Sequence, residues 1–154
     1  MSQIPGPIEK RDILFGVKKL SSVELTKLAE SLQKEGWISD AADFLGQTQN
    51  IEELRKLRSM AIEEGDTFLF LKIGRLMGES ESPAAELLRC AEKAEALGKT
   101  RYAIKAYEKL GNTEKTEALK ATISSDGDIL AEAQQTVFIP ETEDEFLEGE
   151  EQED

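Results

Sequence analysis

The stretch AEALGKTRYAIKAYEKLG, residues 94–111, places a glycine in the middle of a run that otherwise favours a helix. Gly98 is followed by Lys99 and Thr100, then by alanines and aromatic residues at helical spacing, and then by Gly111. Glycine adopts the left-handed backbone conformation at low cost and commonly ends helices there. We therefore predict that one helix ends at Gly98, that Thr100 caps the next, and that the chain folds back as a hairpin ending at Gly111.

The same pattern occurs twice earlier in the chain, at Gly36 and Gly65. The three glycines are 29 and 33 residues apart, which is the spacing of helical repeats. In one domain, the sequence predicts three hairpins, over about residues 22–49, 50–80 and 82–111. Capping helices are expected over residues 8–20 and 113–123, after an N-terminal arm at 1–7.

Local signals indicate where these helices begin and end. Pro7 suits the first turn of a helix, and Ser21 with Glu24 matches a capping box. Further N-caps are expected at Asn50, at Asp66 or Thr67, at Ser39 or Asp40, and at Ser82 before Pro83, and helix ends at Gly36, Gly46, Gly65 and Gly78.

The third hairpin has the clearest side-chain pattern. Its order of large, small, glycine, small, aromatic and apolar residues is carried by Leu87, Cys90, Ala91, Leu97, Gly98, Ala103, Tyr107 and Leu110. This order resembles tetratricopeptide-type repeats. The first hairpin matches in Leu25, Leu28, Ala29, Gly36, Ala41 and Leu45. The second departs, because Arg58 and Phe70 replace small residues and Gly74 replaces the aromatic.

The resemblance implies an all-α fold, in which antiparallel helical hairpins stack as a short right-handed α-solenoid. Such units bury their apolar faces only against their neighbours. Small residues would let the paired helices approach closely, namely Ala29, Ala41, Ala91 and Ala103. Aromatic residues would fill the space between hairpins, namely Trp37, Phe44, Phe68 and Tyr107. The shortened units also look like the repeats of coatomer- and clathrin-type trafficking solenoids.

The resemblance further implies a protein-binding scaffold whose first helices line a concave groove. Counted back from each turn glycine, the groove positions are Thr26, Glu30, Gln33 and Lys34, then Arg55, Ser59 and Glu63, then Leu88, Glu92 and Glu95. Glu30 and Glu92 stand where some relatives have the asparagine of a clamp for a C-terminal carboxylate. A cochaperone that binds chaperone tails is therefore not expected.

The C-terminal segment is the most unusual part of the sequence. Residues 141–154 hold nine acidic residues and no basic ones, and the whole chain has a net charge of −13. We expect residues 124–154 to form a short helix, 129–135 with Asp128 as its cap, followed by a flexible acidic tail. Either this tail solubilises the protein, or Phe138-Ile139 or Phe146-Leu147 binds a partner as a short linear motif.

A small basic stripe precedes this tail, formed by Lys99, Arg101, Lys105 and Lys109. These side chains would share part of one helix face. They are expected to be solvated or paired with Glu95 and Glu108, and their functional alternative is a docking site for acidic protein, this chain's own tail included.

Most catalytic chemistry is disfavoured by composition. The chain has no histidine, which removes the commonest acid–base group and most zinc sites. The single cysteine, Cys90, is expected to be a buried, inert thiol in a reducing cytoplasmic compartment. Asp126 and Asp128 lack the other ligands of a calcium loop, and no phosphate-binding loop is present. We expect no enzyme, metal or cofactor.

The partner class also follows from charge. The acidic balance disfavours nucleic acid and anionic membranes as partners, and no apolar run reaches the length of a membrane span. The leading hypothesis is a scaffold or adaptor that binds a protein through its groove, its tail or both. The alternatives are a chaperone or assembly factor that shields a basic client, and a solenoid fragment of a larger complex.

Overall fold

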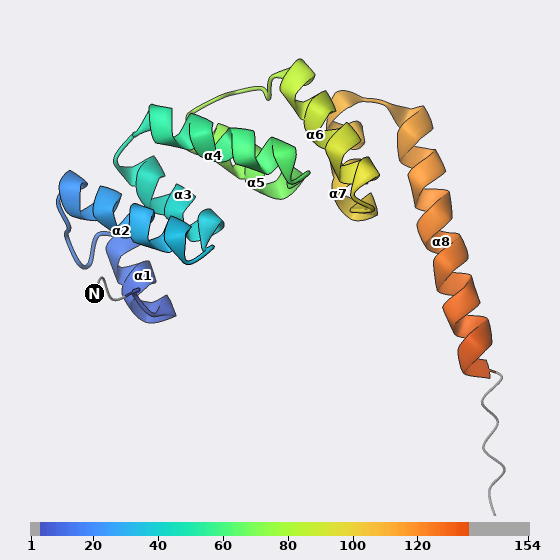
Figure 1. The fold of residues 1–154 in the computed structure, drawn as a ribbon, viewed down its shortest axis with the longest axis horizontal. Helices are drawn as coiled ribbons and strands as arrows, with labels where there is room; N and C mark the ends of the chain where they lie inside the picture. Colours follow the sequence, from blue (N-terminus) through green and yellow to red (C-terminus); the bar gives the residue numbers. More distant parts are fainter. Residues whose placement is uncertain (1–3, 136–154) are drawn as a thin grey trace, which may run out of the picture.

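The computed structural model describes residues 4–135, and every regular element in this range is an α-helix. In chain order the helices are α1 (Pro7–Leu14), α2 (Ser22–Lys34), α3 (Ile38–Gln47), α4 (Ile51–Glu63), α5 (Thr67–Leu76), α6 (Ala84–Ala96), α7 (Thr100–Leu110) and α8 (Thr113–Gln135). They form an elongated row, with α1 at one end and α8 projecting from the other (Figure 1).

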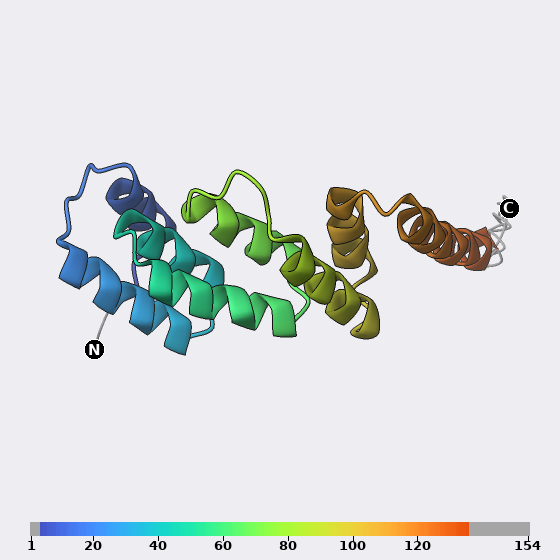
Figure 2. The same ribbon diagram turned by 90° about the horizontal axis from the view of Figure 1, so that it is seen from above.

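Consecutive helices pack in pairs. α2 packs on α3, α4 on α5, and α6 on α7. The pairs are joined by contacts of α3 with α4 and α5, of α4 with α6, and of α5 with α6 and α7. Figure 2 places α2, α4 and α6 along one side of the row and α3, α5 and α7 along the other.

The predicted glycine turns are confirmed. At the end of α2 the N–H of Gly36 donates to Gln33 O at 3.0 Å, and the N–H of Trp37 donates to Leu32 O at 2.8 Å. This pair of bonds requires a left-handed residue, which Gly36 supplies with φ +83°. The same turn, again with a glycine at positive φ, follows α4, α5, α6 and α7 at Gly65, Gly78, Gly98 and Gly111.

The turn after α3 differs from the expectation, because Gly46 lies inside the helix and does not end it. Gln49 takes the left-handed conformation instead, with φ +53°. A Cβ at Gly46 would lie 2.7 Å from Cδ2 of Leu76 at the end of α5. Gly46 therefore allows α3 and α5 to approach each other. The turn lies further along the chain, at Gln49, directly before Asn50, which caps α4.

The predicted caps are confirmed in part. Ser21 and Glu24 form a capping box, and Asn50 and Asp66 accept from backbone N–H groups at the starts of α4 and α5. The caps expected at Ser39 or Asp40, Ser82 and Thr100 are wrong, since the N-cap residues are Trp37, Pro83 and Lys99, none with a side-chain cap bond. At Trp37 and Lys99 the last residue of one turn also starts the next helix, so no position remains for a separate cap.

Two helix lengths also differ from the expectation. The first helix ends at Leu14 and not at residue 20, because Gly16 leaves the helical conformation with φ +77°. Within the expected helix Ile13 is buried, whereas Val17 lies beyond the helix end and is exposed. The last helix continues to Gln135, where we expected a turn at 126–128 and a second helix capped by Asp128. One glycine costs about 1 kcal/mol inside a helix, which leaves a helix through Gly127 possible.

One apolar core runs along the row. The alanines expected at close helix contacts, Ala29, Ala41, Ala91 and Ala103, are all fully buried. Phe44 and Tyr107 are buried as expected, but Trp37 and Phe68 are 57% and 51% exposed and do not fill the space between hairpins.

Arg58 explains how the irregular second hairpin packs. It stands where a small residue was expected, and it is nearly buried. Its Nη1 lies 2.6 Å from Oε1 of Glu79 and its Nε lies 2.9 Å from Oε2 of Glu86. Its guanidinium also lies 5.7 Å from the ring centre of Phe70. The large side chain therefore joins α4 to the α5–α6 loop and to α6 through paired charges.

Candidate protein-binding site

The predicted groove positions lie on the first helices of the three pairs. Thr26, Glu30, Gln33 and Lys34 are on α2, Arg55, Ser59 and Glu63 on α4, and Leu88, Glu92 and Glu95 on α6, all exposed or half-buried. Helix contacts join α4 to α6, whereas α2 contacts α3. The structure therefore brings together the positions of the second and third hairpins, and it does not bring those of α2 against α4.

Several of these side chains are held by internal contacts. Glu63 pairs with Arg89 and Lys93 of α6, at 3.4 and 3.0 Å. Glu95 lies 2.9 Å from Lys115 of α8 and accepts a hydrogen bond of 2.9 Å from the Tyr107 hydroxyl. These two bonds lower the pKa of Glu95, and burial together with the Glu95 charge raises the pKa of Tyr107 to about 12. Glu63 and Glu95 therefore join helices.

Apolar side chains gather at the N-terminal end of the row, where an open cleft of about 600 Å³ lies between the N-terminal arm, α1 and the start of α3. We call it the N-terminal cleft. Its lining is mostly apolar and consists of Ile4, Pro5, Gly6, Pro7, Leu14, Phe15 and Trp37, with Lys10, Arg11 and Asp40 as its charged residues. Phe15 is 80% exposed. Large exposed apolar patches on a protein surface mark interaction sites, and the apolar lining makes this cleft a candidate for one.

Trp37 was missed as a site residue because we assigned it to the core. It is the residue directly after the turn glycine, where its N–H closes the turn and its side chain lies outside the helix pair. The corresponding residues after the turns that end α3 to α7 are polar, namely Asn50, Asp66, Glu79, Lys99 and Asn112. A tryptophan at a position that holds polar residues after these five helices was the signal available in the sequence.

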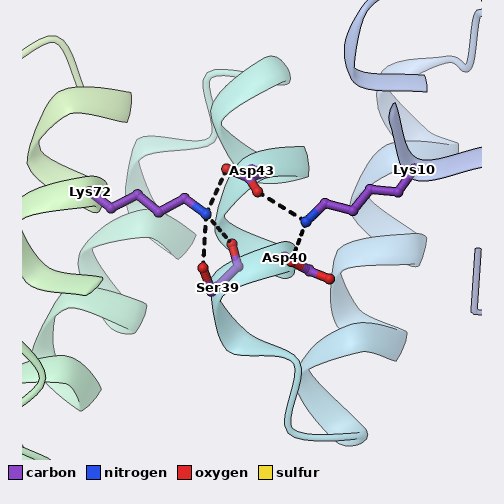
Figure 3. Close-up of polar contacts among 5 residues, drawn as sticks. All are labelled: Lys10, Ser39, Asp40, Asp43 and Lys72. Atoms are coloured by element: carbon purple, nitrogen blue, oxygen red, sulfur yellow. Dashed lines mark hydrogen bonds and ion pairs between the residues drawn. The ribbon is translucent and has the colours of Figure 1, made fainter. Parts of the chain in front are cut away.

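A polar network lies beside this cleft (Figure 3), and two of its residues, Lys10 and Asp40, line it. Lys10 of α1 pairs with Asp40 and, at 3.3 Å, with Asp43, both on α3. Lys72 of α5 lies 2.8 Å from Asp43 and donates to the carbonyl and hydroxyl oxygens of Ser39 at 2.9 and 2.8 Å. Three helices are therefore joined at the point where the cleft begins.

This network also sets the charge of the cleft. Burial alone would lower the pKa of Lys10, but its hydrogen bond to Asp40 and the charges of Asp40 and Asp43 raise it above the ordinary value. Lys10 therefore stays protonated and paired at neutral pH. Lys10 and Asp40 therefore form a satisfied ion pair within the lining of the N-terminal cleft, and its apolar residues remain as the binding feature.

A second cleft, of about 720 Å³, lies between α5, the α5–α6 loop, α6 and α7. We call it the basic cleft. Its apolar lining includes Phe68, Leu71, Leu87 and Leu110, and its charged lining comprises Arg75, Lys105 and Lys109 together with Glu79 and Glu81. Half of the basic stripe expected from the sequence lies here. Lys99 is not in the lining, because it donates to the Glu64 carbonyl oxygen at 2.6 Å, and Arg101 is exposed elsewhere.

Further features of the described residues bear on metal binding, thiol reactivity and membrane insertion. Among residues 4–135 no group of three or more acidic, cysteine or histidine side chains could hold a metal ion. Cys90 is buried, and burial raises the pKa of its thiol, which suppresses the reactive thiolate. No described helix is both long and apolar enough to cross a membrane. The motif residues Phe138, Ile139, Phe146 and Leu147 lie outside the described residues.

Comparisons of the chain with protein-family models, with curated proteins and with solved structures found no match. The two clefts are therefore the features of this chain that bear on its function.

Proposed function

We propose that this chain is a non-catalytic protein-binding module. In this proposal the helix pairs are a short right-handed α-solenoid of tetratricopeptide-like hairpins, and the N-terminal cleft receives an apolar segment of a partner protein. The single observation that carries the proposal is the exposure of Trp37 at a cleft whose other walls are Ile4, Leu14 and Phe15.

The energetics of this surface favour a protein partner. Covering apolar surface contributes about 25 cal/mol per Å², and tryptophan is enriched among the residues that dominate protein interfaces. Lys10 and Asp40 satisfy one another, so a partner need not supply a charge to them. The fitting occupant is one large apolar side chain on a helix or extended segment, with polar groups outside the cleft.

The scarcity of catalytic side chains also supports a binding role. It has no histidine, and its single thiol is buried. The buried charged side chain among the described residues, Arg58, is used in packing between helices. A binding role accounts for an exposed tryptophan, whereas a catalytic role would leave it unexplained.

The proposal is tested by affinity capture from a lysate of the source organism with the immobilised full chain. The test variant is Trp37→Ser, and the matched control is Leu97→Ser, because Leu97 is 55% exposed and also neighbours a turn glycine. A protein enriched by the native chain and by the control, and lost with Trp37→Ser, supports the proposal. Equal capture by all three chains removes the cleft from it.

A second pair of variants separates the cleft from the predicted groove. Lys34→Glu and Arg55→Glu reverse exposed charges on α2 and α4. We expect capture to be unchanged by both. Loss of the partner with either variant, and not with Trp37→Ser, would assign binding to the first helices.

A further inference from the structure

Three basic side chains of the basic cleft have no ion-pair partner among the described residues. Within residues 4–135, Arg75, Lys105 and Lys109 take part in no ion pair, although Lys115 and Lys120 nearby are paired with Glu95 and Glu108. Lys105 and Lys109 are four residues apart on α7 and share one helix face. In the same lining Glu79 is paired with Arg58, and Glu81 is the one other acidic residue, so the three cations are in excess.

The apolar part of the basic cleft is open as well. Phe68 is about half exposed, and its ring is held edge-on against Tyr102, with ring centres 5.0 Å apart at 84°. Leu71 and Leu110 complete this side of the lining. The cleft therefore fits a peptide that carries an apolar side chain between acidic residues.

We propose that the basic cleft binds the acidic C-terminal segment of the same chain, residues 141–154. This segment has nine acidic residues and no basic ones, and its one pair of large apolar residues is Phe146-Leu147. Phe146 or Leu147 would contact the apolar lining at the Leu110 end of the cleft, and the flanking carboxylates would pair with Arg75, Lys105 and Lys109. Opposite charges steer such an encounter and fix its orientation.

The length of the chain permits this contact within one molecule. α8 has 23 residues, and at 1.5 Å per residue it is about 34 Å long. Phe146 follows the end of α8 by 11 residues, which span up to about 36–40 Å when extended. The segment can therefore return along α8 to the end of α7, where Lys109 and Leu110 line the cleft.

The proposal goes beyond the proposed function, because the two clefts share no lining residue. The bound segment would cover the basic cleft and exclude acidic segments of other proteins from it. Failure of either proposal leaves the other standing, since partner capture through Trp37 is measured independently of the C-terminal segment.

The test uses the full chain with a nitroxide spin label at Gly149→Cys, in a Cys90→Ala background so that only one thiol is present. Paramagnetic broadening of the backbone amide NMR signals is read at low salt. We expect selective loss of signal intensity for residues 68–75 and 105–110. The broadening should disappear at about 1 M salt, where the Debye length is about 3 Å.

Charge-reversal variants provide the matched control. Lys105→Glu with Lys109→Glu should abolish the broadening, whereas Lys19→Glu with Lys27→Glu, an equal charge change at exposed residues outside the basic cleft, should leave it. Absence of broadening at residues 68–75 and 105–110 in the low-salt spectrum overturns the proposal. So does equal broadening, in a mixed sample, of isotope-labelled chains that carry no spin label by spin-labelled chains of natural isotope abundance, because a second copy then supplies the segment.

Discussion

Replacement of Gly65 by alanine tests directly whether neighbouring helix pairs pack closely. Gly65 forms the turn between α4 and α5 with φ +62°, and a Cβ there would lie 2.6 Å from both Cα and N of Ala94 in α6. These are backbone atoms, so no flexible side chain can move aside. Gly98 is the matched control, since it has φ +69° but no atom within 4 Å of an added Cβ.

The expected magnitudes follow from these two environments. An alanine held in the left-handed conformation costs about 1–2 kcal/mol, and this applies to both variants. Overpacking against fixed neighbours adds about 1–3 kcal/mol, and this applies to Gly65→Ala alone. The loss of chain entropy in the unfolded state is the same for both substitutions and cancels in the comparison.

The assay is urea unfolding followed by far-ultraviolet circular dichroism, with the slope of the transition compared between variants. We expect the free energy of unfolding of Gly65→Ala to be lower than that of Gly98→Ala by about 1–3 kcal/mol. Equal destabilisation by the two variants would refute the close approach of the α4–α5 turn to α6.

Three further predictions concern single contacts. Ser21→Ala removes the capping box of α2 and should lower the free energy of unfolding by about 1 kcal/mol in urea titrations; no change would mean that the start of α2 is frayed. The pKa of Glu95 is held below its ordinary value by Lys115 and Tyr107. Ionised Glu95 therefore stabilises the fold above the ordinary glutamate pKa, and this stabilisation is lost as the pH falls through the lower folded-state pKa. Unfolding measured between neutral pH and about pH 3 should therefore show a smaller acid destabilisation in Glu95→Gln than in the native chain, and identical pH profiles would argue against the bond. Arg58→Met leaves the carboxylates of Glu79 and Glu86 unpaired and should lower the free energy of unfolding by about 1–3 kcal/mol, less than for a fully buried pair because these partners are partly exposed. Adding Glu79→Gln should recover part of this loss. Strictly additive effects in the double-mutant cycle would contradict a direct pairing.

Much of the helix order was predictable because its signals are local. The turns at Gly36, Gly65, Gly78, Gly98 and Gly111 each depend on one residue that reaches positive φ without strain. Gly46 was misassigned because its role is set by a distant residue, Leu76, which approaches it from α5. No local pattern shows that a glycine is required for a contact between helices and not for a turn.

The candidate site was less predictable for the same physical reason. The groove positions lie on the expected helices, but whether α2 meets α4 depends on how complete helix pairs pack. Trp37 was assigned to the core from its residue type, and its exposure follows from its place after the turn. Likewise, only Lys105 and Lys109 of the basic stripe line the basic cleft, since Lys99 bonds the neighbouring turn.

The most direct test of the binding proposal is photo-crosslinking from position 37. A benzophenone-bearing phenylalanine analogue is placed at Trp37 in one full-length chain and at Leu97 in another, and each is irradiated in a lysate of the source organism. We predict one discrete protein adduct from position 37 and none from position 97. Adducts from position 97, or the absence of any adduct from position 37, would contradict the N-terminal cleft as the partner-binding surface.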